Sequence, residues 1–145
     1  MKQLIKDIIT PEEASYLIDL TSGEKISVKH PTIKKDLIDK IKGVINDLVQ
    51  VSWKHPSYIK LECNRQKPHN WHLDTGSKNH MTWCSSGCSI LLNDREGAGY
   101  LEYRDGTVIE AEDHYCSLAI HSSDEEHRTI HEPNKRTTLL AFLTS

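Results

Sequence analysis

A histidine and an aspartate two residues apart are the feature of this sequence best suited to bind a metal ion. His72 and Asp74 are separated by one leucine. In an extended chain the side chains at positions i and i+2 point to the same side, so both can reach one ion. A third ligand is available in the histidine-rich stretch 121–131. Two histidines and one carboxylate on one face of an octahedral metal leave three positions open for other ligands.

Three histidines in that stretch are candidates for the third ligand. They are His121, His127 and His131, all more than forty residues after His72. The residues alone do not decide between them. A His-x-Asp pair is also common by chance, and the competing interpretation is a surface loop with a hydrogen-bonded histidine. The metal-site hypothesis therefore depends on what else the sequence places around these residues.

The four cysteines are interpreted as reduced thiols. They are Cys63, Cys84, Cys88 and Cys116, in a chain whose size does not call for a disulfide framework. Cys84 and Cys88, close to His80, match half of a zinc site, but such sites pair two groups of ligands at this spacing and the sequence has no second cysteine pair. Because Cys88 begins a predicted core strand, we interpret it as a small apolar core residue.

Composition limits the classes to which the chain can belong. With 145 residues, 37% hydrophobic and 27% charged, it fits one compact domain over 1–145. The formal net charge of −3 gives no support to a nucleic-acid partner. The sequence has no apolar run of the roughly 18 residues that a membrane span needs, and its first residues lack the apolar segment of a secretory signal. We therefore expect no membrane partner and a cytoplasmic location.

Two helices are predicted in the first third of the chain. Thr10 is a hydroxyl cap followed by Pro11 at the first helical position and by two acidic residues, and this helix is expected to end at 21–23. The second helix is predicted over about 31–51, because apolar residues recur there at intervals of three and four. Both helices are interpreted as scaffold that packs an apolar face on the core.

After residue 53 the pattern changes to short apolar or alternating runs between turn residues. Seven strands are predicted, over 58–61, 88–92, 100–103, 107–109, 116–120, 128–130 and 138–143. Two helices followed by many short strands predict an α+β, mainly β fold, with helical support in 1–52 and a jelly-roll core in 53–145. The helices are expected to pack on one sheet, and the open mouth of the core is the expected place for a site.

The order of the motifs resembles that of the Fe(II)- and 2-oxoglutarate-dependent dioxygenases. His72-x-Asp74 is followed by the segments 91–94 and 97–103, and then by His127 and, nine residues later, Arg136. More narrowly, this order is similar to that of the prolyl 4-hydroxylase type of catalytic domain. The resemblance covers about 58–143, and it implies a double-stranded β-helix core, which is a jelly roll.

The resemblance also implies roles for five residues. His72, Asp74 and His127 would hold Fe(II), since the spacing from His127 to Arg136 matches the family better than that from His121 or His131. Arg136 would pair with the far carboxylate of the co-substrate 2-oxoglutarate, because a guanidinium matches a carboxylate bidentately and keeps its charge. Thr138 shares a strand face with Arg136 and would donate to the same carboxylate. Ascorbate is a candidate reductant.

Three positions depart from the family's pattern. Where the family places a tyrosine that contacts 2-oxoglutarate, this sequence has Glu62 and Cys63, and the tyrosine of a later triplet is Leu91. We therefore expect the co-substrate pocket to be completed differently, through Thr138, a serine or a water. Ala98 replaces a turn glycine.

The expected reaction is hydroxylation of proline in a peptide or protein, coupled to decarboxylation of 2-oxoglutarate to succinate. A small-molecule substrate is an alternative, and the segment 76–87, flanked by Trp71 and Trp83, is the candidate substrate loop. The nucleic-acid demethylase branch would have a second arginine where this chain has Phe142.

Two other functions remain as alternatives. The first is a cupin-like metal-binding module without oxygenase activity, which would have no reason to place Arg136 near the metal. The second is a purely structural protein, in which His72, Asp74 and His127 would lie far apart.

Overall fold

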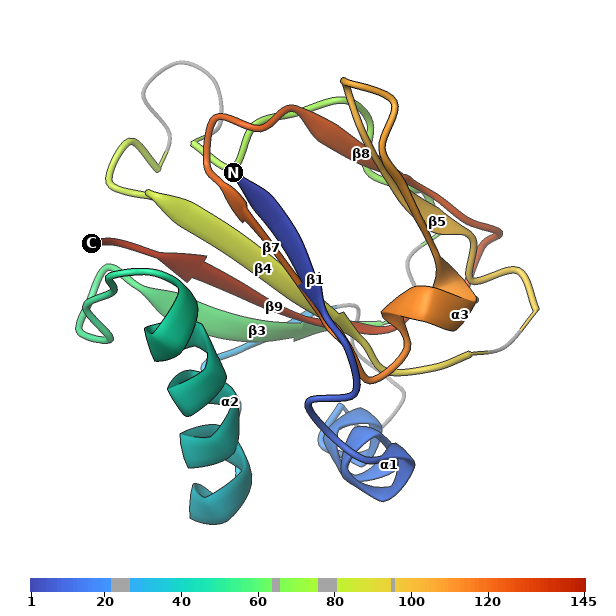
Figure 1. Cartoon of the computed structure of the whole chain (residues 1–145). Helices are drawn as coiled ribbons and strands as arrows, with labels where there is room; N and C mark the ends of the chain where they lie inside the picture. Colours follow the sequence, from blue (N-terminus) through green and yellow to red (C-terminus); the bar gives the residue numbers. More distant parts are fainter. Residues whose placement is uncertain (22–26, 64–65, 76–80, 95) are drawn as a thin grey trace.

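The fold consists of two antiparallel sheets with helices on the outer face of the larger one (Figure 1). The computed structural model describes residues 1–21, 27–63, 66–75, 81–94 and 96–145. The larger sheet has the order β1-β7-β4-β9-β3-β2 and the smaller one the order β6-β5-β8. The strands are β1 (Lys2–Ile5), β2 (Ser27–Lys29), β3 (Tyr58–Glu62), β4 (Ser86–Leu91), β5 (Tyr100–Tyr103), β6 (Val108–Glu110), β7 (Leu118–Ser122), β8 (His127–Ile130) and β9 (Thr138–Leu143). The helices are α1 (Pro11–Asp19), α2 (Lys35–Leu48) and α3 (Ala111–His114).

The main apolar core lies between the larger sheet and the helices α1 and α2. Figure 1 shows both helices on one side of this sheet and the smaller sheet on the other. Leu17 from α1 and Ile41 and Ile45 from α2 are fully buried in the same cluster as alternate residues of the sheet. The sheet residues of this cluster include Leu61, Ile90, Leu118, Ile120, Leu139 and Ala141. This arrangement confirms the predicted fold class, mainly β with a jelly-roll-like core and helices on one sheet.

The opposite face of the larger sheet is partly polar, because side chains alternate along each strand. On β7, Leu118 and Ile120 join the apolar core, whereas Ala119 and His121 face the smaller sheet. On β3, Leu61 belongs to the core while Lys60 and Glu62 line a pocket between the sheets. The same strands therefore supply the core with one face and a polar pocket with the other.

The predicted helices form, with different bounds for the second. Thr10 caps α1 as expected: its hydroxyl accepts from the Glu13 N–H, and the Glu13 carboxylate accepts from the Thr10 N–H in a capping box. The second helix begins at Lys35, four residues later than predicted at 31. Lys34 is extended, and its N–H donates to the Tyr16 hydroxyl, so the preceding segment packs on α1 instead of continuing the helix.

The region 1–52 also contains two strands, β1 and β2, which the sequence did not predict. They have four and three residues, and each pairs along the edge of the sheet, β1 with β7 and β2 with β3. Their stability comes from long-range pairing, and a sequence pattern cannot show it. The strand predicted over 116–120 begins at Leu118, because Cys116 has a positive φ of 59° that is incompatible with a strand. None of the described helices is long and apolar enough to cross a membrane.

Truncation of Ile45 tests the packing of α2 on the sheet. Ile45→Ala should lower the free energy of unfolding by about 2–4 kcal/mol, because it removes buried methyl groups and leaves a cavity. Asp47→Ala, an exposed change on the same helix, should stay within about 0.5 kcal/mol of the wild type. Denaturant unfolding measures both. A loss below about 1 kcal/mol for Ile45→Ala would contradict the packing described.

Candidate functional site

The structure brings His72, Asp74 and His127 together. One ligand atom from each residue lies within 4.8 Å of the other two. His127 begins β8, and His72 forms an antiparallel bridge with it, in which the backbone N–H of each residue donates to the carbonyl of the other at 3.0 Å. Backbone pairing therefore holds the two imidazole rings side by side, with centroids 4.3 Å apart.

Both imidazole rings are oriented by backbone carbonyls. His72 Nδ1 lies 2.6 Å from the Asn70 carbonyl oxygen, and His127 Nδ1 lies 2.6 Å from that of Glu125. Because a carbonyl oxygen only accepts, Nδ1 of each ring carries a proton, and Nε2 is the nitrogen that remains to face a ligand. Histidines that bind metals are held in this way, with one nitrogen donating to the protein and the other available to the ion.

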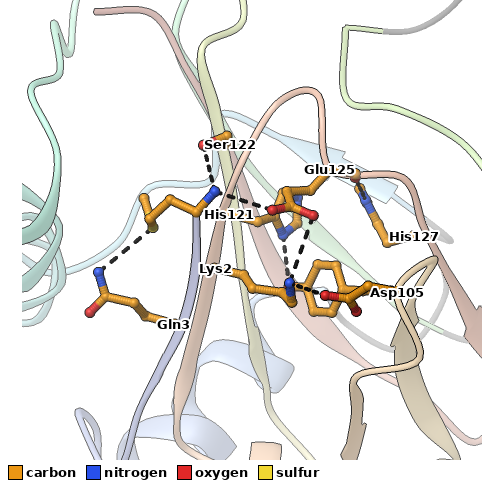
Figure 2. A network of polar contacts seen from close by, with 9 residues as sticks. Lys2, Gln3, Asp105, His121, Ser122, Glu125 and His127 are labelled. Carbon is orange, nitrogen blue, oxygen red and sulfur yellow. Dashed lines mark hydrogen bonds and ion pairs between the residues drawn. The ribbon is translucent and has the colours of Figure 1, made fainter.

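Ion pairs hold the side chain of Glu125, the residue whose backbone carbonyl orients His127. Lys2 of β1 lies with its Nζ 3.9 Å from Glu125 Oε2 and forms an ion pair with Asp105 (Figure 2). The backbone carbonyl of Glu125 is the one that accepts from His127. An edge strand of the larger sheet therefore supports the turn that orients a candidate ligand.

Asp74 is a buried carboxylate between two histidines. Its Oδ2 lies 2.6 Å from His121 Nε2, and its Oδ1 lies 3.2 Å from His127 Nε2. Burial would raise the pKa of Asp74, but hydrogen bonds from His121 and His127 outweigh it and hold that pKa well below the ordinary value. Burial likewise would lower the pKa of His127, and the contact with Asp74 raises it instead. The pKa of His72 is lowered by burial and by the neighbouring His127.

The other two candidate histidines lie elsewhere in the pocket. His121 contacts Asp74 but is outside the group of potential ligands found among the described residues. Its Nδ1 lies 2.9 Å from the hydroxyl of Tyr103, a residue that is 1% exposed and whose pKa is raised by burial. His131 lines the same pocket, with its Nδ1 bonded to the Glu132 carbonyl. Of the three candidate histidines, His127 is the one that joins His72 and Asp74 in the group of potential ligands found in the described part of the chain.

Arg136 is a buried cation in the same pocket. It is 6% exposed, and its Nη1 donates to the carbonyl of Ala98 while its Nη2 donates to His114 Nδ1. Its Nε has no hydrogen-bond partner among the described residues. Burial lowers the pKa of Arg136 to about 10, and burial together with Arg136 lowers the pKa of His114 to about 3, so His114 is a neutral acceptor.

This arrangement fits an anionic ligand. A buried guanidinium is costly unless it is paired with a negative charge, and within the described part of the chain no acidic side chain forms an ion pair with Arg136. Arg136 and Thr138 line the same pocket as the three candidate ligands. The pocket is lined by Lys60, Glu62, His69, His72, Asp74, Cys88, Ser89, Leu101, His121, His127, Thr129, His131, Arg136, Thr138, Leu140 and Phe142.

The turn before β5 presents the carbonyl that holds Arg136. Gly97 and Gly99 flank Ala98 and both have positive φ, and a Cβ at Gly99 would come within 1.7 Å of the Ile130 carbonyl oxygen. The two glycines are therefore needed on either side of Ala98, whereas Ala98 itself tolerates a methyl group. An alanine at position 98 therefore still presents its backbone carbonyl to Arg136.

At Glu62, one of the positions that depart from the pattern of the resembled family, the structure has a buried ion cluster. Glu62 is 4% exposed, pairs in register with Thr138, and contacts His69 Nε2 at 2.7 Å and Lys60 Nζ at 3.1 Å. Burial would raise the pKa of Glu62, but His69 and Lys60 lower it to about 2. His69 and Lys60 were not predicted as pocket residues. The alternation of Lys60 and Glu62 along one strand places both side chains on the same face, and it was the signal that could have indicated Lys60.

The cysteines and tryptophans take structural positions. All four cysteines are buried free thiols, and none belongs to the metal-ligand group of the described residues; His80 lies outside those residues. Burial raises the pKa of Cys84 to about 11 and raises that of Cys88 further, so both stay thiols. Trp71 directly precedes His72. The guanidinium carbons of Arg104 and Arg128 lie 4.4 and 4.6 Å from the centroid of its ring.

The fold is that of known prolyl hydroxylases. No model of a protein family matches the sequence, and no curated protein matches it. Among solved structures, the chain is similar to a viral collagen prolyl hydroxylase from Paramecium Bursaria Chlorella virus-1 in a 2OG complex, with a TM-score of 0.73, 10% identity, and coverage of 99% of this chain and 95% of that one. It is also similar to a Pseudomonas putida prolyl-4-hydroxylase, with a TM-score of 0.70, 11% identity, and coverage of 99% and 91%.

A third similar structure was solved with a peptide. It is a prolyl hydroxylase from Trichoplax adhaerens in complex with a fragment of the hypoxia inducible factor oxygen degradation domain, with a TM-score of 0.66, 8% identity, and coverage of 99% of this chain and 83% of that one. The likeness covers 99% of this chain and 83–95% of the three other chains, although only 8–11% of the residues are identical. The protein therefore has the fold of the prolyl 4-hydroxylase type of 2-oxoglutarate-dependent dioxygenase domain.

The Glu62 cluster predicts a pH-dependent contribution to stability. Because the pKa of Glu62 falls from its ordinary 4.5 to about 2 on folding, ionised Glu62 stabilises the fold above pH 4.5, and this contribution is lost as the pH falls toward 2. Glu62→Gln should lower the free energy of unfolding at pH 7 by up to roughly 3 kcal/mol. Denaturant unfolding at several pH values measures it, with Glu110→Gln on an exposed position as control. This account would be contradicted if the difference in the free energy of unfolding between the wild type and Glu62→Gln did not shrink below pH 4.5.

Proposed function

We propose that this protein is an Fe(II)- and 2-oxoglutarate-dependent dioxygenase that hydroxylates proline in a peptide or protein. The observation that carries the proposal is the pairing of two sites in one pocket. The group formed by His72, Asp74 and His127 offers two nitrogens and a carboxylate, and the buried Arg136 in the same pocket has no acidic partner among the described residues. The first suits a divalent ion and the second suits the carboxylate of an oxo acid.

In this proposal His72, Asp74 and His127 hold Fe(II), and Arg136 and Thr138 bind the far carboxylate of 2-oxoglutarate. Fe(II) with 2-oxoglutarate and dioxygen supplies the oxidant for C–H hydroxylation, with release of succinate and carbon dioxide. The three ligand residues would hold the ion and leave part of its coordination to the substrates. Arg136 orients the oxo acid, and its carbonyl partner at Ala98 keeps the guanidinium in place. Leu101, Leu140 and Phe142 supply apolar side chains to the pocket wall.

Glu62 has a different part in this proposal. Its carboxylate would repel 2-oxoglutarate if it were free, but one oxygen contacts His69 and the other contacts Lys60. The cluster therefore presents little net charge toward the co-substrate. Ser89, whose hydroxyl contacts His114, lines the same region and is the kind of neutral donor expected in place of the absent tyrosines.

A proline-containing peptide is the proposed substrate. The support is the likeness to prolyl hydroxylases, one of which was solved with a peptide bound. The candidate substrate loop 76–87 lies partly outside the described residues, and its described end carries Trp83, which packs near Tyr58. The alternative of a small-molecule substrate is tested by the succinate assay described below. The cytoplasmic location stays a prediction.

The location of Arg136 favours the oxygenase over a simple metal-binding module. A module that only binds an ion gains nothing from a buried guanidinium in the pocket of the ion, and burial of that charge costs stability. A purely structural role predicts that the three candidate ligands lie apart, and the structure places them together.

Removal of a candidate ligand tests the metal site. His72→Ala should abolish succinate formation from 2-oxoglutarate with Fe(II) and ascorbate, because the ion loses one of its three protein ligands. The fold should persist, and His55→Ala, on an exposed position, should retain wild-type turnover. The assay is run with and without a proline-rich peptide, and stimulation by the peptide supports prolyl hydroxylation. Unchanged turnover in His72→Ala would remove the assignment of the ligands.

Substitution of Arg136 tests the anion site. Arg136→Ala should raise the 2-oxoglutarate concentration for half-maximal turnover by about 10- to 100-fold, since a charge-assisted hydrogen bond contributes roughly 1.5–3 kcal/mol. Arg136→Lys should have a smaller effect, because it keeps the charge but loses the bidentate geometry. Lys135→Ala, an exposed neighbour, is the control. If neither Arg136 variant changes the requirement, the co-substrate binds elsewhere.

A further inference from the structure

The two carboxylate oxygens of Asp74 face different partners. Oδ1 lies 3.2 Å from His127 Nε2, on the side of the candidate metal ligands, whereas Oδ2 lies 2.6 Å from His121 Nε2. His121 is 4% exposed and outside the group of candidate ligands found among the described residues. One oxygen of the carboxylate is therefore directed toward the site, and the other is bound to a residue that the proposed function does not use.

The hydrogen bonds assign the proton on His121. The Tyr103 hydroxyl lies 2.9 Å from His121 Nδ1. A phenol is protonated near neutral pH, and an ionised carboxylate can only accept. Because the carboxylate only accepts, Nε2 of His121 carries the proton that is donated to Asp74 Oδ2, and Nδ1 is left to accept from the phenol. The three side chains form one directed chain, Tyr103 to His121 to Asp74.

The backbone is built around this chain. Gly87 on β4 pairs in register with His121 on β7, and a Cβ at Gly87 would lie 1.8 Å from Asp74 Oδ2 and 3.0 Å from His121 Nε2. Only glycine leaves room there for the contact. Tyr103 comes from the smaller sheet, where it pairs in register with His127, and Lys2 Nζ lies 5.6 Å from the centroid of its ring.

We propose that Tyr103 and His121 are positioning residues that restrict Asp74 to binding the metal ion through one oxygen. This inference rests on the proposed function. With Oδ2 held by His121, the carboxylate would bind an ion through Oδ1 alone, and the three protein ligands would leave the other positions of the ion to the substrates. A carboxylate that bound through both oxygens would leave one position fewer.

The first experiment measures metal binding without turnover. Co(II) is titrated into the protein and followed by its visible absorption. His121→Phe should weaken Co(II) binding by about 10- to 100-fold, the range for loss of a residue that orients a metal ligand. His121→Gln places an amide N–H near Asp74 and should recover most of the affinity. Tyr103→Phe keeps the packing of the ring and should give a smaller loss. Tyr100→Phe, on the opposite face of β5, is the control and should match the wild type.

The second measurement detects chelation of the co-substrate. Under anaerobic conditions, 2-oxoglutarate chelated to Fe(II) gives a metal-to-ligand charge-transfer band. The intensity of this band at saturating Fe(II) should fall in His121→Phe and return in His121→Gln. Gly87→Ala should behave like His121→Phe, because its methyl group displaces Asp74 Oδ2. Gly43→Ala, where a Cβ has open space, is the matched control.

The third measurement needs no metal. Nitrogen chemical shifts of the His121 ring in the metal-free protein should show the proton on Nε2, and Tyr103→Phe should reduce the preference for this tautomer. Wild-type Co(II) affinity together with a wild-type charge-transfer band in His121→Phe, or a His121 ring without a proton on Nε2, would overturn the positioning role even if the protein produces succinate. Conversely, loss of Co(II) affinity in His121→Phe in a protein that forms no succinate would support the positioning role and refute the proposed reaction.

Discussion

The burial of charge between two sheets is the constraint on which the rest of this structure depends. A buried ion is costly unless it has a partner, and the pocket contains Asp74, Glu62 and Arg136, all less than a tenth exposed. The two carboxylates are compensated within the chain, Asp74 by histidines on both oxygens and Glu62 by a histidine and a lysine. Arg136 differs, because its contacts among the described residues are a carbonyl and a neutral histidine, with no acidic side chain. In the proposed function, this charge binds the anionic co-substrate.

Strand alternation allows a stable core and a charged pocket to share the same strands. One face of the larger sheet packs against α1 and α2 through aliphatic side chains, and the other face supplies side chains such as Glu62, His121 and Thr138 to the pocket. A substitution in the pocket therefore alters a different set of contacts from one in the main core. This separation lets the candidate ligands be varied in experiments while the scaffold stays folded.

The positions at which this sequence departs from the pattern of the family that it resembles have a common physical explanation. Where a tyrosine hydroxyl was expected, the chain has a carboxylate, and a carboxylate is tolerated there because Lys60 and His69 contact it. The alanine in the turn at 97–99 is tolerated because only its neighbouring glycines need positive φ, and its carbonyl still holds Arg136. At 8–11% identity, the likeness to the similar solved structures lies in the fold rather than in identical residues.

The sequence by itself determined the features that depend on near neighbours. The capping box at Thr10, the apolar period of α2 and the convergence of His72 with Asp74 follow from local geometry, which a few consecutive residues specify. Tertiary structure alone decided that His127 lies beside that pair while His121 binds the far oxygen of Asp74. It also decided that the edge strands β1 and β2 form and that a glycine is required at 87. These outcomes depend on which strands pair across tens of residues, and pairing at that range is set by the packing of the whole sheet rather than by any short segment.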